Sequence, residues 1–78
     1  MKPVVTEKAV MMIESQNVLT FETNKEQTKG DIKKEIEELF DVKVEKIRTI
    51  IRLNKKYAYV KLKKEFPAID LAMKLGLM

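Results

Sequence analysis

Apolar residues recur along this chain with two periods, one typical of helices and one typical of strands. In the segment 28–40, four of them follow the helical spacing i, i+4, i+7 and i+8, namely Ile32, Ile36, Leu39 and Phe40. Thr28 is a suitable N-cap, and Asp31 three residues later completes a capping box. We therefore expect a helix from about Lys29 to Phe40, with the whole apolar stripe in the core.

Two further segments have helical character. Thr6 is a suitable N-cap for a helix that extends to about Ser15 and ends at Gln16-Asn17. The inner face of this helix is expected to consist of Ala9, Met12 and Ile13. Pro67 favours the first position of a last helix, which Gly76 ends. The buried side of that helix is expected to comprise Ala68 or Ile69, with Leu71, Ala72 and Leu75.

Period-two alternation predicts strands at residues 18–23, 42–53 and 57–63, with a turn at 54–56, and Val4-Val5 is a candidate for a short opening edge strand. In the last strand Ala58, Val60 and Leu62 share one face, and the other face carries Tyr57, Tyr59 and Lys61. Within 42–53 the apolar residues change from even to odd positions. A β-bulge explains this change, and so does a sheet that helices cover on both faces. We favour the covered sheet, because three helical segments must pack against it.

The element order is a short strand, helix, strand, helix, strand, strand, helix, which predicts an α+β fold in one domain spanning residues 1–78. A chain of 78 residues buries only about 60% of its extended-chain surface, so its core is expected to be thin. No run approaches the roughly 20 apolar residues of a membrane helix, and the N-terminus lacks the apolar region of a signal peptide. We therefore expect no membrane insertion and a cytoplasmic location.

The composition argues against catalysis. The chain contains no histidine, the commonest general base, and no cysteine, so it offers neither a disulfide nor a thiolate metal site. Glu35, Glu37 and Glu38 lie among lysines on the polar side of a helix, a charge run typical of a solvated surface. The two glycines are too far apart to form a phosphate loop. We expect no enzyme, no cofactor, no metal and no small-molecule substrate.

The positive charge is concentrated in one segment. The net charge is +4, yet residues 1–47 have a balance of −2 and residues 65–78 one of −1. The segment 48–64 carries +7 with no acidic residue, through Arg48, Arg52, Lys55, Lys56, Lys61, Lys63 and Lys64. A focused patch of cations indicates a polyanionic partner better than a high isoelectric point does.

Aromatic rings interleave with these cations. Tyr57, Tyr59 and Lys61 share one strand face, and on a sheet surface such rings can stack on bases while cations contact phosphates. The alternative is that both tyrosines pack under a helix with their hydroxyls in water. A second cationic cluster lies at the start of the middle helix, at Lys29, Lys33 and Lys34. The positive charge of this cluster interacts unfavourably with the helix dipole. Two explanations are open: an anionic partner relieves the interaction, or Asp31 and Glu37 compensate the charge within the chain.

Several segments, in this order and at this spacing, resemble family twenty-three of the large-subunit ribosomal proteins in its compact archaeal form. They are VVTEKAVMMIE at 4–14, TKGDIKKEIEELFDVKVEKIRT at 28–49, YAYVKLKKE at 57–65 and the ending LGLM. The resemblance covers roughly Val4 to Leu77. Arg48 stands where the family usually has asparagine, and Tyr57 stands where it usually has a cation. The short turn from Leu53 to Lys56 replaces the long basic loop of bacterial members.

The resemblance implies a mostly antiparallel four-stranded sheet with helices packed on both faces, an α/β/α sandwich. It also implies a structural protein that binds ribosomal RNA beside neighbouring ribosomal proteins at the exit of the nascent-chain tunnel. Together with the charge pattern, it assigns RNA contact to Lys8, Lys29, Lys33, Arg48, Thr49, Arg52, Lys55, Lys56, Tyr57, Lys61 and Lys63.

Glu7 matches the family's glutamate to which the bacterial chaperone trigger factor docks. The archaeal form implies other docking partners, namely the signal recognition particle, the protein-conducting channel and nascent-chain-associated factors. The competing hypothesis is a free-standing α+β module that uses an exposed strand edge for a protein partner, with the lysines serving only solubility. Salt dependence separates the two hypotheses, because binding to phosphates weakens steeply as the salt concentration rises.

Overall fold

The helices begin and end where local side chains cap them. Thr6 accepts a hydrogen bond at Oγ1 from the Ala9 N–H at 3.0 Å, and helix α1 runs over Glu7–Gln16. Thr28 and Asp31 form the expected capping box at the start of helix α2, Lys29–Phe40, each side chain accepting from the other's backbone N–H. The predicted bounds of both helices are therefore confirmed to within a residue.

The computed structural model describes residues 2–76. Besides α1 and α2 it contains helix α3, Ala68–Lys74, and four strands: β1, Lys2–Pro3; β2, Val18–Thr23; β3, Val44–Arg52; and β4, Lys55–Leu62. Gly76 follows α3 in the left-handed conformation at φ +75°, as expected of a helix end. Leu77 and Met78, which complete the LGLM ending, lie outside the described residues.

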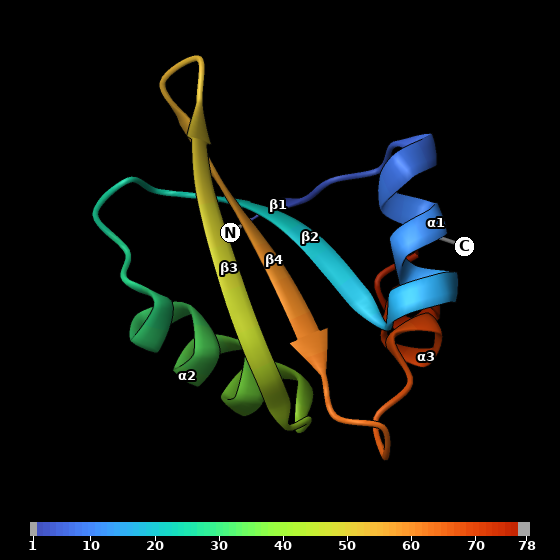
Figure 1. The fold of residues 1–78 in the computed structure, drawn as a ribbon. Helices are drawn as coiled ribbons and strands as arrows, with labels where there is room; N and C mark the ends of the chain where they lie inside the picture. Colours follow the sequence, from blue (N-terminus) through green and yellow to red (C-terminus); the bar gives the residue numbers. More distant parts are fainter. Residues whose placement is uncertain (1, 77–78) are drawn as a thin grey trace.

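The strands form one antiparallel sheet in the order β1-β2-β4-β3. Strands β2 and β3 each pair antiparallel with β4, so they run parallel to each other, and α2 connects them across one face of the sheet. Figure 1 shows β3 crossing in front of α2, while α1 and α3 lie together beside β2. The predicted α+β class and four-stranded antiparallel sheet are confirmed.

The two faces of the sheet differ in what covers them. One face packs against α2 and α3 and forms the core, to which α1 also contributes Ile13. The other core residues are Leu19, Phe21, Val44, Ile47, Ala58, Val60 and Leu62 from the strands and Ile32, Ile36, Ala68, Leu71 and Ala72 from α2 and α3. On the opposite face, within residues 2–76, α1 borders the sheet beside β2. Helices therefore flank both faces as expected, but the β3–β4 half of one face is open.

The change of parity in the long strand comes from a β-bulge, so the covered sheet that we favoured is the wrong explanation. Val44 pairs with Leu62, but the next pair is Lys46 with Lys61, which leaves Glu45 as an extra residue. Glu37, expected to be solvated, accepts a hydrogen bond at Oε2 from the Val44 N–H at 2.9 Å beside this bulge. The bulge shifts every later residue of β3 by one position and so returns Ile47 to the core face.

The hairpin turn is shorter than predicted. Strand β4 begins at Lys55 and β3 ends at Arg52, so the turn consists of Leu53 and Asn54. Both residues have positive φ, at +51° and +65°. This combination belongs to the two-residue turns whose twist matches that of the adjoining strands. Leu53 is consequently 91% exposed, and Ile51 beside it is 66% exposed, so neither belongs to the core.

The apolar stripe of α2 is only partly buried. Ile32 and Ile36 have no exposed surface, and Phe40 packs against the core while half-buried. Leu39 is 65% exposed, so its expected place in the core is wrong. In the last turn the side facing the sheet carries Glu37 and Phe40, and Leu39 lies about 100° around the helix axis from Phe40.

Which side of α2 is buried can be tested with two matched alanine substitutions. Ile36→Ala is expected to lower the free energy of unfolding by about 2–5 kcal/mol, because it removes buried methylenes and leaves a cavity. Leu39→Ala, three residues away on the same helix, is expected to change it by no more than about 0.5 kcal/mol. Urea unfolding followed by circular dichroism measures both values. An equal decrease in the two variants would show that the helix buries a different side.

Asn17 joins α1, β4 and α3 at the end of α1. It takes the left-handed conformation at φ 58° that ends the helix. Its Nδ2 donates to the carbonyl oxygens of Leu62, Lys63 and Phe66 at 3.0, 3.3 and 3.2 Å, and its Oδ1 accepts from the Ala68 N–H. Helix α3 has no side-chain cap of its own, so Asn17 caps it across a sequence separation of 51 residues.

Two substitutions separate the backbone role of Asn17 from that of its side chain. Asn17→Gly keeps the left-handed conformation but removes the amide, and we expect a decrease in stability of about 1–3 kcal/mol from the unpaired groups. Asn17→Ala is expected to cost about 1–2 kcal/mol more, because a Cβ disfavours positive φ. Denaturant midpoints measure both. A glycine variant as stable as the parent would show that the amide hydrogen bonds contribute nothing.

Candidate nucleic-acid interface

The open half of the sheet and α1 together form a groove. Side chains of one parity on β3 and β4 point to this face, and α1 supplies the opposite wall. The groove has a volume of about 440 Å³ and is lined by Lys8, Met12, Gln16, Val18, Lys46, Arg48, Ile50, Arg52, Tyr59 and Lys61. We call it the basic groove, because five of these residues are cations and none is acidic.

The pairing of the strands places cations against cations. Lys46 lies directly opposite Lys61, and Arg52 lies directly opposite Lys55. Like charges at such positions are mutually destabilising. Within residues 2–76 the single ion pair joins Lys55 to Glu22, with 3.4 Å between Nζ and Oε1, and it is largely exposed. The cations of the basic groove thus have no carboxylate partner among the described residues, and a bound anion would remove their repulsion.

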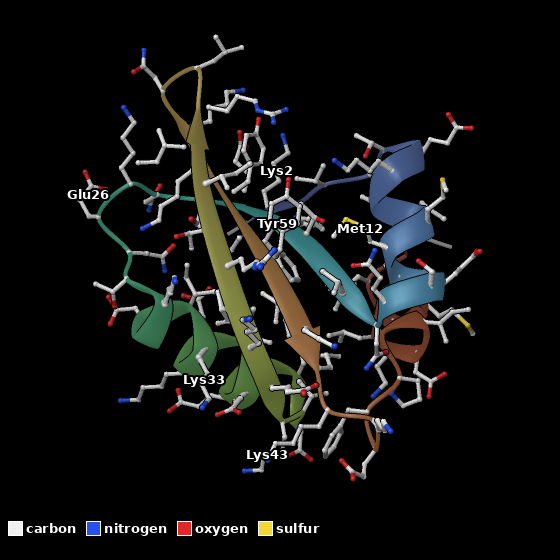
Figure 2. The ribbon with its side chains drawn as sticks, in the orientation of Figure 1. Lys2, Met12, Glu26, Lys33, Lys43 and Tyr59 are labelled. Atoms are coloured by element: carbon white, nitrogen blue, oxygen red, sulfur yellow. The ribbon has the colours of Figure 1, made fainter. Side chains whose placement is uncertain are left out.

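The tyrosines lie between these cations. Tyr59 pairs with Arg48 on one side and Thr20 on the other, and Tyr57 pairs with Ile50 and Glu22. Both rings are half-buried. Figure 2 shows Tyr59 in front of the sheet on the side of Met12, which projects from α1. The rings therefore line hollows that α1 borders, and each keeps part of its surface exposed.

A smaller cavity adjoins the basic groove and shares five of its lining residues. Its volume is about 220 Å³, and it is lined by Val4, Thr6, Lys8, Ala9, Met12, Thr20, Ile50, Arg52, Tyr57 and Tyr59. We call it the tyrosine cavity. Val4 and Thr6 of the N-terminal segment line it, and the Val4 N–H donates to the Thr20 carbonyl oxygen at 3.0 Å.

Only some of the expected RNA-contacting residues meet in these hollows. Five of them line the basic groove, the tyrosine cavity or both, namely Lys8, Arg48, Arg52, Tyr57 and Lys61. Lys55 lies on the same face, near the hairpin turn, and its ammonium group pairs with Glu22.

The remaining expected residues lie elsewhere. Thr49 and Lys56 are on the core face of the sheet, and the Lys56 Nζ donates to the Gln27 carbonyl oxygen. Lys29 and Lys33 are exposed on α2, and Figure 2 shows Lys33 on the far side of the sheet from Tyr59. The exposed Lys63 follows β4, and the exposed Glu7 lies in the first turn of α1. These residues form no common site with the basic groove.

Sequence reasoning missed Lys46, which lines the basic groove. It fell outside the uninterrupted basic segment, and the bulge at Glu45 hid which face it shares. The signal was nevertheless present in the alternation of the strand. After the bulge every second residue points to the open face, and these residues are Lys46, Arg48, Ile50 and Arg52. Counting backwards from the hairpin, and not forwards from Val42, would have placed Lys46 and Arg48 on the open face and not on the core face.

Other site classes find no support in the described part of the chain. Among residues 2–76 no three histidine, cysteine, aspartate or glutamate side chains cluster closely enough to hold a metal ion. No helix in that range has the length and apolar character needed to cross a membrane. The basic groove and tyrosine cavity are therefore the features around which a function can be argued.

A comparison with protein families is consistent with this surface. The family model described as "Ribosomal protein L23" matches residues 1–66. The match includes all four strands, α1 and α2, and thus every residue that lines the basic groove and the tyrosine cavity. Helix α3 follows the matched region.

Proposed function

The chain belongs to the ribosomal protein L23 family, and on that premise we propose that it is a structural, non-catalytic constituent of the large subunit that binds ribosomal RNA at the tunnel exit through its basic groove. The observation that carries this proposal is the set of five cations without a carboxylate in one groove. Phosphates dominate the affinity of proteins for nucleic acid, and lysine and arginine side chains are their usual partners. All five cations are exposed and thus accessible to an RNA backbone.

The proposal extends to location and neighbours. As a compact, archaeal-type member, the protein would function in cytoplasmic ribosomes, beside other large-subunit proteins. The short Leu53-Asn54 turn supports a surface position, because a turn of two residues cannot extend far from the sheet. Lys29 and Lys33, on the far side of the sheet, would then contact a separate RNA segment. Thr49 and Lys56 are less suited to that role, since they lie on the core face.

A protein-binding module is the competing function, and one observation favours it. Strand β3 is an edge strand, so one side of its backbone has no partner strand within the described residues. A bulge and the cations Lys46, Arg48 and Arg52 lie along this edge, and such features usually discourage strand addition. RNA binding by the face of the sheet is therefore the better-supported function.

Neutralising the basic groove tests RNA binding. Changing Lys46, Arg48, Arg52 and Lys61 together to glutamine is expected to flatten the dependence of log K on log salt concentration. The slope should fall by about 0.7–0.9 for each phosphate that the protein no longer neutralises, or up to about 3.6 in total. Fluorescence anisotropy with a large-subunit RNA fragment over a range of salt concentrations measures it.

The control removes the same charge from other surfaces. Glutamine at the exposed positions Lys25, Lys34, Lys64 and Lys74 should leave most of the slope intact. Circular dichroism confirms that both variants fold. An equal effect of the two variants would show that RNA binding follows net charge and not the basic groove, and no salt dependence in the parent would favour the protein-binding module.

Glu7 is a candidate docking residue at the tunnel exit. Its carboxylate is exposed in the first turn of α1 and forms no ion pair within the described residues. There it stabilises the helix dipole by only about 0.3–1 kcal/mol, so Glu7→Gln should fold normally. The variant could not, however, form a charge-assisted hydrogen bond with a basic docking surface.

The measurement uses ribosomes that carry the Glu7→Gln protein. We expect weaker binding of the signal recognition particle, the protein-conducting channel or nascent-chain factors, with normal subunit assembly. Glu14→Gln, on the same helix and equally exposed, is the matched control. Equal binding by parent and Glu7→Gln ribosomes would leave Glu7 as a helix-start residue only.

A further inference from the structure

The tyrosine cavity contains a polar group that the fold leaves without a partner. Thr20 is 7% exposed, and its Oγ1 is buried without a hydrogen-bond partner within the described residues. A buried hydroxyl without a partner costs free energy, so such groups are uncommon in folded proteins. Thr20 is among the residues that line the tyrosine cavity, so this unpaired hydroxyl lies beside a hollow that a ligand can enter.

Aromatic and apolar groups surround this hydroxyl. Thr20 lies directly opposite Tyr59 in the sheet, a position that brings their Cβ atoms to about 4.5–5.5 Å. Tyr57, Ile50 and Met12 complete the apolar walls. A flat ring that enters here meets an aromatic ring, a methionine and a hydroxyl that can both donate and accept. Cations are found only at the rim, through Lys8 and Arg52.

We propose that the tyrosine cavity binds one unpaired RNA nucleotide, whose base stacks on Tyr59 and forms a hydrogen bond with the Thr20 hydroxyl. The adjacent phosphates would then meet Arg52 and Lys8. The inference rests on the proposed function and specifies what part of the RNA the surface recognises. Sequence-specific recognition of RNA commonly relies on such unstacked bases, held on aromatic side chains.

The dimensions of the cavity favour a single base. Its volume of about 220 Å³ is below the roughly 300–1,000 Å³ of pockets that enclose drug-sized ligands. The backbone of a paired duplex would make little use of it, because phosphates gain nothing from apolar walls and a buried hydroxyl. The larger basic groove beside it offers the cations that a backbone needs. The basic groove and the tyrosine cavity together therefore suit an RNA segment whose backbone lies in the groove while one unpaired nucleotide projects into the cavity.

The test uses two short RNA hairpins that are identical except that one, the bulged hairpin, contains a single unpaired adenosine. For the fluorescence measurement, 2-aminopurine replaces this adenosine. The parent protein is expected to bind the bulged hairpin about tenfold more tightly, and the 2-aminopurine signal should be quenched by stacking. Thr20→Val is expected to weaken this binding about three- to tenfold, the value of one hydrogen bond. Its thermal stability should be equal or higher, because valine has the same shape and no unpaired hydroxyl.

Two controls make the result specific. Thr23→Val removes the other buried hydroxyl without a partner among the described residues, which lies on the opposite face of β2, and should leave binding unchanged. Tyr59→Phe keeps the ring and should retain the preference for the bulged hairpin, whereas Tyr59→Leu should abolish it. The melting temperature of each variant is measured beside its affinity, so that a loss of binding caused by a folding defect is recognised.

The outcomes separate the inference from the proposed function. Equal, salt-dependent binding of both hairpins would overturn the nucleotide site and leave RNA binding by the basic groove intact. A preference for the bulged hairpin that survives both Thr20→Val and Tyr59→Leu would also overturn it. Absence of salt-dependent binding to either hairpin would contradict the proposed function itself.

Discussion

The strict alternation of side chains along β4 is the constraint on which the core and the surface both depend. This strand lies between β2 and β3, so its register fixes theirs. Ala58, Val60 and Leu62 enter the core, while Tyr59 and Lys61 enter the groove on the other face. A slip of one residue would exchange the two sets, burying cations and exposing the core. The packing energy of the core therefore also holds the side chains of the basic groove in their positions.

The bulge at Glu45 serves the same constraint. Without it, Val44 and Ile47 could not both reach the core, because they differ in parity. With it, Val44 packs beside Leu62 and Ile47 beside Val60, and the cations of β3 keep to the open face. The Glu37 carboxylate accepts the Val44 N–H at this point and ties the end of α2 to the start of the strand. A charged helix residue thus stabilises an irregularity that the groove requires.

Asn17 fixes the other side of the molecule. Small domains have thin cores, so contacts between elements distant in sequence contribute much of what keeps them together. This one residue ends α1, donates to three carbonyl oxygens at and after the end of β4 and caps α3. Since α1 also provides Lys8 and Met12 to the hollows, the contacts that hold this helix bear on the candidate interface. Stability and binding therefore share residues that are not themselves part of the groove.

The sequence by itself determined the helices, the three longer strands, the fold class and the concentration of charge, because caps, periodicity and composition act over a few residues. It placed the short opening strand at Val4-Val5, whereas β1 is Lys2–Pro3. It placed Thr6, Thr28 and Asp31 at helix starts and assigned the faces of β4 correctly. Only the tertiary structure decided that Leu39 is exposed, that a bulge shifts β3 and that Lys46 joins the groove. It also separated Thr49 and Lys56 from the cations of the open face, and it left the Thr20 hydroxyl without a partner among the described residues. These outcomes depend on how whole elements pack and pair across the sheet, and local patterns of residues do not specify such long-range arrangements.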